Sequence, residues 1–497
     1  MAKTAAPKPL ERGIAYWMQR VVVEREKASG SFNADAVHDL RVALRRCRSI
    51  AEGFQNVDGD PSWKKMRKAG KVVFSALGDL RDTQVLLEWI ERLRSECPPV
   101  AERLSSHCLQ REAELKTRAA EVVDRFDTQR WQQWALKLDE QVQAAGNPAE
   151  VFQVLALERY EAARLLHSKA LRDRSKTALH ELRIGIKKLR YIVENFLPEL
   201  DRSWGKDLRH IQDLLGEVHD LDVLLNTARQ TQAFGSPQER QQWYAAVSRE
   251  RTQRVQAYRD KMLGRHALWQ EWRSGLPAGE NLRRAVVKRF ETWAASLDPD
   301  PVHTHLVTQW SLELYDALHA GGLVPARNAG EVSPRDLLQV AAIMHGVGHC
   351  GRDQVSHKVS ARRLQKLEVP PGWSATDLLI AALVVRCHRG ALPTTRKRDA
   401  DLSFGNQHLV DCLGGILRLA DSLDSQHDHA IRAIAVRQSD GRTDIIADGY
   451  VPRSPQAEKI AAARHMLENA FDIALLVREP RTHTAANDKQ PITSNAT

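Results

Sequence analysis

Two short segments of the sequence carry the same row of basic residues, and such a row suits the binding of an oxyanion. HDLRVALRRCR at residues 38–48 returns as HELRIGIKKLR at residues 180–190. At 100° per residue, the histidine and the three cations of each segment fall within one narrow band along a helix. The members of the two bands are His38, Arg41, Arg45 and Arg48 in the first copy, and His180, Arg183, Lys187 and Arg190 in the second. We call these bands the first and second cationic stripes.

Each stripe has the chemistry of a phosphate-binding surface. Arginine stays charged and presents a planar fork of donors that matches phosphate oxygens. A histidine beside a bound anion is driven towards protonation, which adds a further positive charge. A single helix with a basic face is more typical of a solvated surface. The repetition favours ligand binding, because both copies keep histidine first and arginine in the second and last positions.

A second pair of repeated segments follows the stripes in the same order along the chain. LGDLRDTQVLL at residues 77–87 returns as LGEVHDLDVLL at residues 215–225. In each segment a basic residue precedes an aspartate, which can orient its neighbours by an ion pair. The further basic residues that we assign to the binding surface are Arg81, His219, Lys68 and Lys206. The order and the approximate spacing of the four segments indicate a duplicated helical module.

The four repeated segments resemble the two halves of a CHAD domain, the conserved histidine α-helical domain, over residues 10–275. The resemblance implies a pair of helical bundles, related by pseudo-twofold symmetry, around a basic channel that binds inorganic polyphosphate. It also implies that the two stripes line this channel, with Lys68 and Lys206 near its wall.

Histidines and an aspartate in the C-terminal part of the chain have an order typical of a metal-binding helical domain. His303, His345 and Asp421 offer imidazole and carboxylate ligands for a divalent metal. Their order resembles HD-type phosphohydrolases and, more closely, the C-terminal helical domain of the exopolyphosphatase and guanosine pentaphosphate phosphatase family, over residues 281–480. In the HD pattern an aspartate ligand follows the second histidine, but here Gly346 takes that position.

The missing aspartate argues against catalysis, because hydrolysis of this kind needs a metal that activates water and ligands that fix the metal. We therefore expect a degenerate metal site at His303, His345 and Asp421, no required cofactor and no catalytic residue. The domain is then a metal-free relic that binds phosphate, or its histidines serve only to pack the helices. The remaining imidazoles that can contribute are His349, His357 and His388. A metal-dependent phosphohydrolase acting on polyphosphate or on guanosine tetra- or pentaphosphate is the alternative function.

The composition narrows the class of partner. Lys and Arg number 73 against 63 Asp and Glu, and the net charge of +10 favours acidic partners. Phosphate contacts also give nucleic acids sequence-independent affinity, but neither stripe contains an interleaved aromatic ring on which a base can stack. The first residues, MAKTAAPKPLERG, contain no apolar run of signal-peptide length, so we expect no signal peptide. The sequence also has no run of 18 apolar residues and no cysteine pair with metal spacing. We therefore expect a cytoplasmic protein that binds polyphosphate, with a role at polyphosphate granules, rather than nucleic acid or membrane.

Helix formers dominate the sequence, and segments rich in Gly and Pro divide it. These breaks lie at residues 145–150, 233–238 and 274–281. We expect a mainly α protein in which a duplicated helical bundle is followed by an HD-like helical domain. The halves of the bundle then span about residues 10–145 and 150–275, and the HD-like domain spans residues 281–480.

One segment of the HD-like domain predicts β structure. Apolar residues alternate within residues 430–450 on both sides of Asp440 and Gly441, a pair typical of a tight hairpin turn. The polar residues 481–497 predict a disordered tail. The predicted domain is therefore helical with a small β-hairpin.

Overall fold

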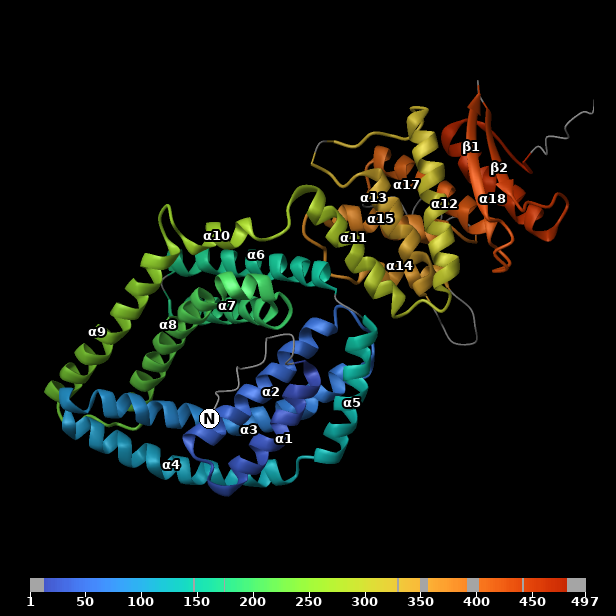
Figure 1. Ribbon diagram of the computed structural model, residues 1–497. Coiled ribbons are helices and arrows are strands. Elements are labelled where there is room, and N and C mark those ends of the chain that lie inside the picture. Colours follow the sequence, from blue (N-terminus) through green and yellow to red (C-terminus); the bar gives the residue numbers. More distant parts are fainter. Residues whose placement is uncertain are drawn as a thin grey trace, which may run out of the picture. The chain divides into compact units, whose positions relative to one another are not determined.

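The structure, a computed structural model, divides into two compact units (Figure 1). Unit 1 is Met1–Ser296 and unit 2 is Leu297–Thr497. The residues that the structure describes are 13–145, 148–173, 175–328, 330–348, 356–390, 402–439 and 442–480. Both units bury large apolar side chains, such as Trp63 in unit 1 and Trp310 in unit 2.

Unit 1 consists of helices in two halves that have the same order. The first half contains α1 (Ile14–Ser31), α2 (Ala34–Phe54), α3 (Pro61–Arg92), α4 (Pro98–Asp124) and α5 (Thr128–Ala145). The second half contains α6 (Ala149–Asp173), α7 (Lys176–Phe196), α8 (Pro198–Gln230), α9 (Pro237–Met262) and α10 (Leu268–Ser274), and α11 (Gly279–Ala295) packs on α6. Helices α2 and α7 both have 21 residues, and α3 and α8 have 32 and 33. The repeat in the sequence therefore corresponds to a repeat in the structure.

The two stripes occupy equivalent positions in matching helices. Asn33 caps α2 by accepting a hydrogen bond of 2.9 Å from a backbone N–H of the first turn, and Ser175 caps α7 in the same way at 3.1 Å. His38 and His180 are each the fifth residue of their helix. The same start signal thus sets the same register, and each stripe begins one turn inside its helix.

The apolar faces of the stripe helices belong to one core that joins the two halves. Leu40 and Leu44 of α2 are buried in the same apolar cluster as Leu182 and Ile186 of α7. Helix α2 also contacts α7, and α3 contacts α8 (Figure 1). The two halves therefore meet along the helices that carry the repeated segments, and the amphipathic pattern of α2 and α7 turns their cations away from the core.

Unit 2 is a helical bundle with a three-stranded sheet. Its helices are α12 (Pro301–Ala320), α13 (Pro334–Met344), α14 (His357–Gln365), α15 (Ala375–Cys387), α17 (Phe404–Leu423) and α18 (Pro455–Phe471). Its strands are β1 (Ala433–Ser439), β2 (Arg442–Asp448) and β3 (Ala474–Arg478). Strand β2 pairs antiparallel with β1 and parallel with β3. Helix α17 contacts α12, α13, α15 and α18, so it forms the centre of the bundle.

The prediction of a mainly helical protein with a small β element is confirmed. The predicted hairpin corresponds to β1 and β2, although its turn residues Asp440 and Gly441 lie outside the described residues. Strand β3 was not predicted, because five residues give too short an alternation to separate a strand from the end of a helix. The predicted tail, residues 481–497, also lies outside the described residues.

No helix in the described parts of the chain combines the length and apolarity that crossing a membrane requires. Four cysteines, Cys47, Cys97, Cys108 and Cys412, are buried free thiols. Burial raises the pKa of Cys412 to about 12, which keeps this thiol protonated and unreactive. Cys350 lies outside the described residues.

Candidate functional site

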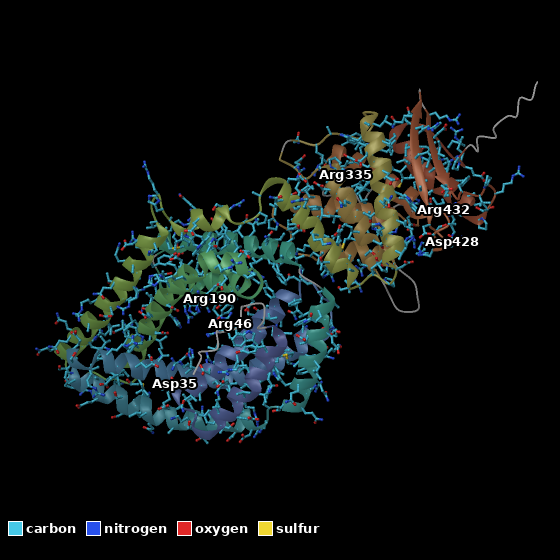
Figure 2. All side chains as sticks on the ribbon, viewed as in Figure 1. Asp35, Arg46, Arg190, Arg335, Asp428 and Arg432 are labelled. Atoms are coloured by element: carbon cyan, nitrogen blue, oxygen red, sulfur yellow. The ribbon has the colours of Figure 1, made fainter. Side chains whose placement is uncertain are left out.

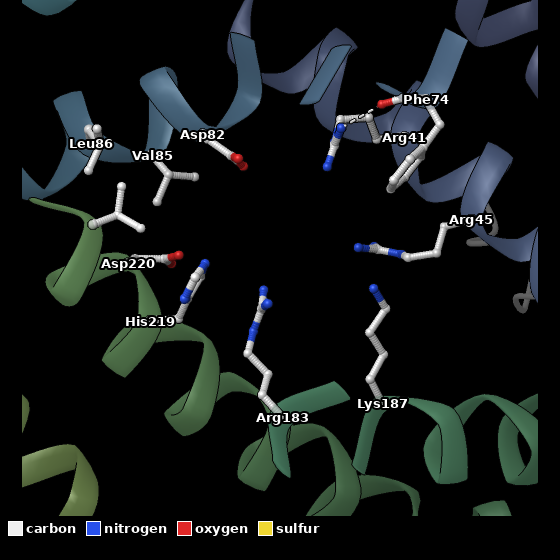
Figure 3. Close-up of a pocket in the computed structure, with 11 residues that line it drawn as sticks. Arg41, Arg45, Phe74, Asp82, Val85, Leu86, Arg183, Lys187, His219 and Asp220 are labelled. Atoms are coloured by element: carbon white, nitrogen blue, oxygen red, sulfur yellow. Dashed lines mark hydrogen bonds between the residues drawn. The ribbon is translucent and has the colours of Figure 1, made fainter. Parts of the chain in front are cut away.

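The two cationic stripes meet at one cavity of unit 1, with a volume of about 210 Å³ (Figure 3). Its charged or titratable lining residues are Arg41, Arg45, Asp82, Arg183, Lys187, His219 and Asp220, and its other lining residues are Phe74, Val85, Leu86 and Val223. Figure 3 shows the four long cationic side chains pointing into the same space. Helix α2 and helix α7 each contribute two of them, so both halves of the repeat build the site.

Arg41 is fixed by the neighbouring helix α3. Its Nη1 donates a hydrogen bond of 2.9 Å to the carbonyl oxygen of Phe74. Its guanidinium also lies 4.2 Å from the centre of the Phe74 ring, within range of a cation–π interaction. Because two contacts hold one side chain, Arg41 presents its remaining N–H donors to the cavity in a set orientation.

The glycines of the two LG motifs lie beside equivalent arginines. A Cβ atom built on Gly78 would lie 3.5 Å from Nη1 of Arg41, and one built on Gly216 would lie 3.9 Å from Nε of Arg183. Both distances are ordinary van der Waals contacts, so any longer side chain would occupy the space of the guanidinium. The LG motif therefore leaves room for the second cation of each stripe.

The cations of the cavity repel one another in a partly buried setting. Burial and the charges of Arg45 and Arg183 lower the pKa of Lys187 to about 8. Burial also lowers the pKa of Arg45 and of Arg41. Burial and the charge of Arg183 lower the pKa of His219 to about 4, so this imidazole is neutral near pH 7. A bound anion would relieve the repulsion and raise these pKa values.

Two aspartates from equivalent positions of the repeat face the cations. Asp82 of α3 and Asp220 of α8 both point into the cavity (Figure 3). Neither forms a direct hydrogen bond or ion pair with a described residue. Burial raises the pKa of Asp220 to about 6, and the nearby charge of Asp82 acts in the same direction. The role of these aspartates as salt-bridge partners, expected from the sequence, is therefore not seen at contact distance.

The last arginine of each stripe lies outside the cavity and has an acidic partner. Nε of Arg48 lies 2.9 Å from Oε1 of Glu52, and Nε of Arg190 lies 3.7 Å from Oε2 of Glu194. Both glutamates are four residues further along the same helix. Glu194 also pairs with Arg46, which like Arg190 lies where α2 and α7 approach each other (Figure 2). Arg48 and Arg190 therefore form ion pairs within their own helices, in addition to belonging to the stripes.

The remaining predicted binding residues surround the cavity without lining it. Nδ1 of His180 lies 3.3 Å from Nδ1 of the lining residue His219. Burial, followed by the charges of Arg81 and Arg45, lowers the pKa of His38. The two lysines that pair across the repeat, Lys68 and Lys206, are exposed.

A row of imidazoles crosses the interior of unit 2. The ring centres of His303 and His345 are 5.3 Å apart, and those of His345 and His388 are 5.4 Å apart. Nδ1 of His345 donates to the carbonyl oxygen of Ala342, and Nδ1 of His388 donates to that of Val385, both at 2.6 Å. Burial lowers the pKa of these two imidazoles to about 4 and about 3, so both rings are neutral and keep Nε2 as an acceptor.

Asp421 of α17 lies beside this row and is neutralised by cations of unit 2. Its carboxylate accepts two hydrogen bonds of 2.6 Å from the guanidinium of Arg389. His303 lies between two carboxylates, with Nε2 3.3 Å from Asp421 and Nδ1 2.8 Å from the fully buried Asp424. Burial opposes ionisation of Asp421, but the hydrogen bonds from His303 and Arg389 hold its pKa well below the usual range.

The predicted metal ligands lie together but are already charge-compensated. One ligand atom from each of His303, His345 and Asp421 falls within 4.8 Å of the others. Nε2 of His345 has no hydrogen-bond partner among the described residues, and its fixed Nδ1 is typical of a metal-binding histidine. The carboxylate of Asp421, however, gives both of its oxygens to Arg389. His303, His345 and Asp421 could therefore bind one metal ion, but the ion would have to displace the guanidinium of Arg389 from Asp421.

Comparison with known proteins finds a family model for each of two stretches of the chain. The family model of the CHAD domain matches residues 18–229. The chain contains a CHAD domain. The model of domain III of the Ppx/GppA phosphatases matches residues 283–447. A crystal structure of the CHAD domain from the plant Ricinus communis is similar at 21% identity, over 56% of this chain and 96% of that chain, with a TM-score of 0.38. No curated protein matches the chain.

The CHAD domain brings together five of the residues selected from the sequence. Arg41, Arg45, Arg183, Lys187 and His219 line its cavity. The other selected residues of this domain are not among those that line the cavity: His38, Arg48, Lys68, Arg81, His180, Arg190 and Lys206. Their part in binding stays a prediction.

Sequence reasoning missed residues whose role depends on contacts between helices. Phe74 fixes Arg41, but an isolated aromatic residue within α3 gives no signal of that contact. Arg389 and Asp424 satisfy the candidate metal site of unit 2, and both lie far along the chain from His303. Only the acidic partners Glu52 and Glu194 could have been found, since each follows a stripe arginine by four residues.

Packing gives a reason for Gly346, which occupies the position of the HD aspartate. A Cβ atom at this residue would lie 2.8 Å from Oγ1 of Thr304 and 3.0 Å from Oδ1 of Asp298. Another segment of unit 2 thus fills the space that a side chain at residue 346 would need. His349, a further predicted imidazole, lies outside the described residues.

Proposed function

We propose that the CHAD domain of this chain binds inorganic polyphosphate in the cavity between its two halves. The observation that carries the proposal is the convergence of Arg41, Arg45, Arg183 and Lys187 on one cavity. None of these four side chains has a carboxylate partner at contact distance among the described residues. An oxyanion can supply that partner, and the forked donors of three arginines match phosphate oxygens.

A polymer of phosphates suits the site better than a single anion. Beyond the cavity the stripes continue through Arg48 on α2 and Arg190 on α7, each of which also has a glutamate partner. Exposed Lys68 and Lys206 extend the basic surface along α3 and α8. A chain that carries a charge on every unit can contact several of these sites at once, and each contact adds to the affinity.

Nucleic acid is the weaker candidate, because the cavity offers no free stacking surface. Among the described residues of its lining, the aromatic rings are Phe74 and His219; the guanidinium of Arg41 covers Phe74, and the ring of His219 packs against His180 with 4.6 Å between ring centres. Binding of single-stranded nucleic acid usually adds base stacking on aromatic rings to phosphate contacts. The cavity therefore favours a ligand that consists of phosphate alone.

Unit 2 has no catalytic step in this proposal. Asp421, the carboxylate that a hydrolytic metal would need, is paired with Arg389 and His303. If an ion displaces Arg389, then His303, His345 and Asp421 would hold it and it would supply Lewis acidity there. The domain then serves binding or association with polyphosphate granules, and the CHAD domain provides the affinity for the polymer.

The test is a titration of the full chain with long-chain polyphosphate and, separately, with single-stranded RNA of equal charge. Polyphosphate is expected to bind more tightly, and log K is expected to fall linearly with log salt concentration. Degradation of the polymer is followed in parallel with Mg²⁺ or Mn²⁺ present, and no turnover is expected. Equal affinity for the two polymers would reduce the protein to a generic polyanion binder.

A further inference from the structure

The imidazole row of unit 2 ends in a group of cations that none of the preceding proposals uses. The ring centre of His357, the first residue of α14, lies 6.1 Å from that of His388. A Cβ atom built on Gly390 would lie 3.3 Å from Cε1 of His357, so the backbone after α15 touches this ring. Three further cations act on His357 from three helices: Lys358, Arg386 and Arg418. We call His357, Lys358, Arg386 and Arg418 the Arg386 cluster.

The charges around His357 are one-sided. Burial lowers the pKa of His357, and the positive charges of Arg386, Lys358, Arg389 and Arg418 act in the same direction. Arg389 is neutralised by Asp421, as described above, but the cluster has no such carboxylate at contact distance among the described residues. Arg418 has a structural role, because its Nη1 donates a hydrogen bond of 3.3 Å to the carbonyl oxygen of Cys387 at the end of α15. Among the described residues, neither Lys358 nor Arg386 has a comparable contact.

Arg386 contains a buried donor that lacks an acceptor. Its Nη1 is shielded from solvent and has no hydrogen-bond partner among the described residues. A buried charged donor without an acceptor costs about 1–3 kcal/mol or more, so such groups are usually satisfied by protein, water or ligand. An anion placed beside Nη1 would satisfy this donor and would offset the repulsion among the cations.

In the part of the chain that the structure describes, the start of α14 has neither a side-chain cap nor an acidic residue in its first turn. Ser356 precedes the helix but makes no side-chain cap, and the first turn contains His357 and Lys358 instead of an acid. By contrast, Ser374 and Asp377 form a full capping box at the start of α15. Positive side chains are unfavourable at the positive end of the helix dipole, whereas an anion there is stabilised by the free backbone N–H groups.

From these observations we infer that the Arg386 cluster binds a phosphoryl group, with donors from Arg386, Lys358, His357 and the first N–H groups of α14. The site lies within unit 2 and does not depend on the cavity of the CHAD domain. Its ligand is either free inorganic phosphate or a phosphate of a short chain, because both present the same tetrahedral oxygens. Arginine at such a site favours phosphate for its bidentate geometry.

The experiment uses the full chain with Arg45→Glu and Lys187→Glu, which disable the cavity of the CHAD domain. Histidine rings are labelled with ¹³C at Cε1, and the signal of His357 is assigned by its loss in His357→Gln. Inorganic phosphate and tripolyphosphate are added in separate titrations. We expect the His357 signal to shift in a saturable way with at least one of them. A response to inorganic phosphate identifies the free anion as a ligand, whereas a response to tripolyphosphate alone identifies a chain phosphate.

Arg386→Gln in the same background is expected to weaken binding about tenfold, the usual value of one charge-assisted hydrogen bond. Lys358→Gln should weaken it in the same direction, while Lys366→Gln, at the other end of α14, should leave it unchanged. Thermal unfolding checks the fold: Arg386→Gln should not lower the midpoint, because it removes a buried donor that has no partner. The inference fails if neither probe shifts His357, or if Arg386→Gln binds as tightly as Lys366→Gln.

Discussion

The two units contain similar side chains but differ in how their charges are paired. In the CHAD domain, Arg45 and Lys187 share a cavity with other cations and have no acidic partner at contact distance. In unit 2, Asp421 accepts two hydrogen bonds of 2.6 Å from Arg389, and Nε2 of His303 lies 3.3 Å from the same carboxylate. In the cavity of the CHAD domain, a bound anion can therefore reduce the repulsion between the cations. In unit 2, the charge of Asp421 is already balanced by Arg389 and His303.

This difference separates residues that bind from residues that stabilise. A buried pair is costly to break, because removing one partner leaves the other charge uncompensated. A group of like charges costs folding free energy in the unliganded protein, and binding of an opposite charge recovers that free energy. Substitutions in the paired region should therefore reduce stability, while those in the unpaired region should reduce binding.

The largest expected effect follows from Asp421→Asn, which removes the charge and nearly keeps the shape. It leaves Arg389 and His303 without their carboxylate, and we expect a loss of about 3 kcal/mol in the stability of unit 2. This is the lower end for a broken buried pair, because 35% of the Arg389 side chain is exposed and solvent screens its charge. Hydrogen exchange of the α17 amides measures the effect within unit 2 alone.

Asp316→Asn is the matched control for Asp421→Asn. Asp316 also receives two hydrogen bonds from one arginine, Arg335, at 2.8 and 3.0 Å. The side chains of Arg335 and Asp316 are 42% and 52% exposed, and Figure 2 shows Arg335 in unit 2. Exposed pairs of this kind contribute about 0–1 kcal/mol. If both variants lost the same amount of stability, the buried contacts of Asp421 with Arg389 and His303 would contribute no more than an exposed ion pair.

The next largest effect concerns the unpaired region. Lys187→Glu should weaken binding of long-chain polyphosphate about a hundredfold, because it removes one charge-assisted contact and adds repulsion inside the cavity. Lys188→Glu is the control, since Lys188 is the next residue of α7 but is exposed. Competition against a labelled polyphosphate measures both affinities, and circular dichroism checks the fold. Similar affinities for the two variants would remove the cavity from the binding site.

The sequence predicts the stripes well because the signals that define them are local. A 3.6-residue period and an early N-cap set which residues share a face, and Asn33 and Ser175 provide that cap at the same place in both copies. The repeat then predicts that both faces serve one purpose. Which cations of a stripe enter the cavity depends on the neighbouring helices, and periodicity alone does not contain that information.

The candidate site of unit 2 was harder to predict, because its key contacts join distant segments. His303 and Asp421 were selected from their order along the chain, but Arg389 was not, and it decides whether the carboxylate is available. The meaning of Gly346 also depends on packing, since Asp298 and Thr304 fill the space beside it. The neighbours of Gly346 therefore leave little room for a side chain, and a sequence motif does not describe such packing.

The smallest expected effect is a pH dependence that sharpens the comparison. The pKa of Lys187 is lowered to about 8 by burial and by Arg45 and Arg183, and a bound anion raises it again. Affinity for polyphosphate should therefore be highest below pH 8 and should fall as the pH rises through this value. The reason is that Lys187 loses its proton at a lower pH in the free protein than in the complex. If the anion raises the pKa by about one unit, the loss is about tenfold. Lys187→Arg, which keeps its charge, should flatten the profile between pH 7 and pH 10, whereas Lys188→Arg should retain the wild-type profile. A profile that stays steep in Lys187→Arg would assign the proton to another group and would remove Lys187 as the titrating contact.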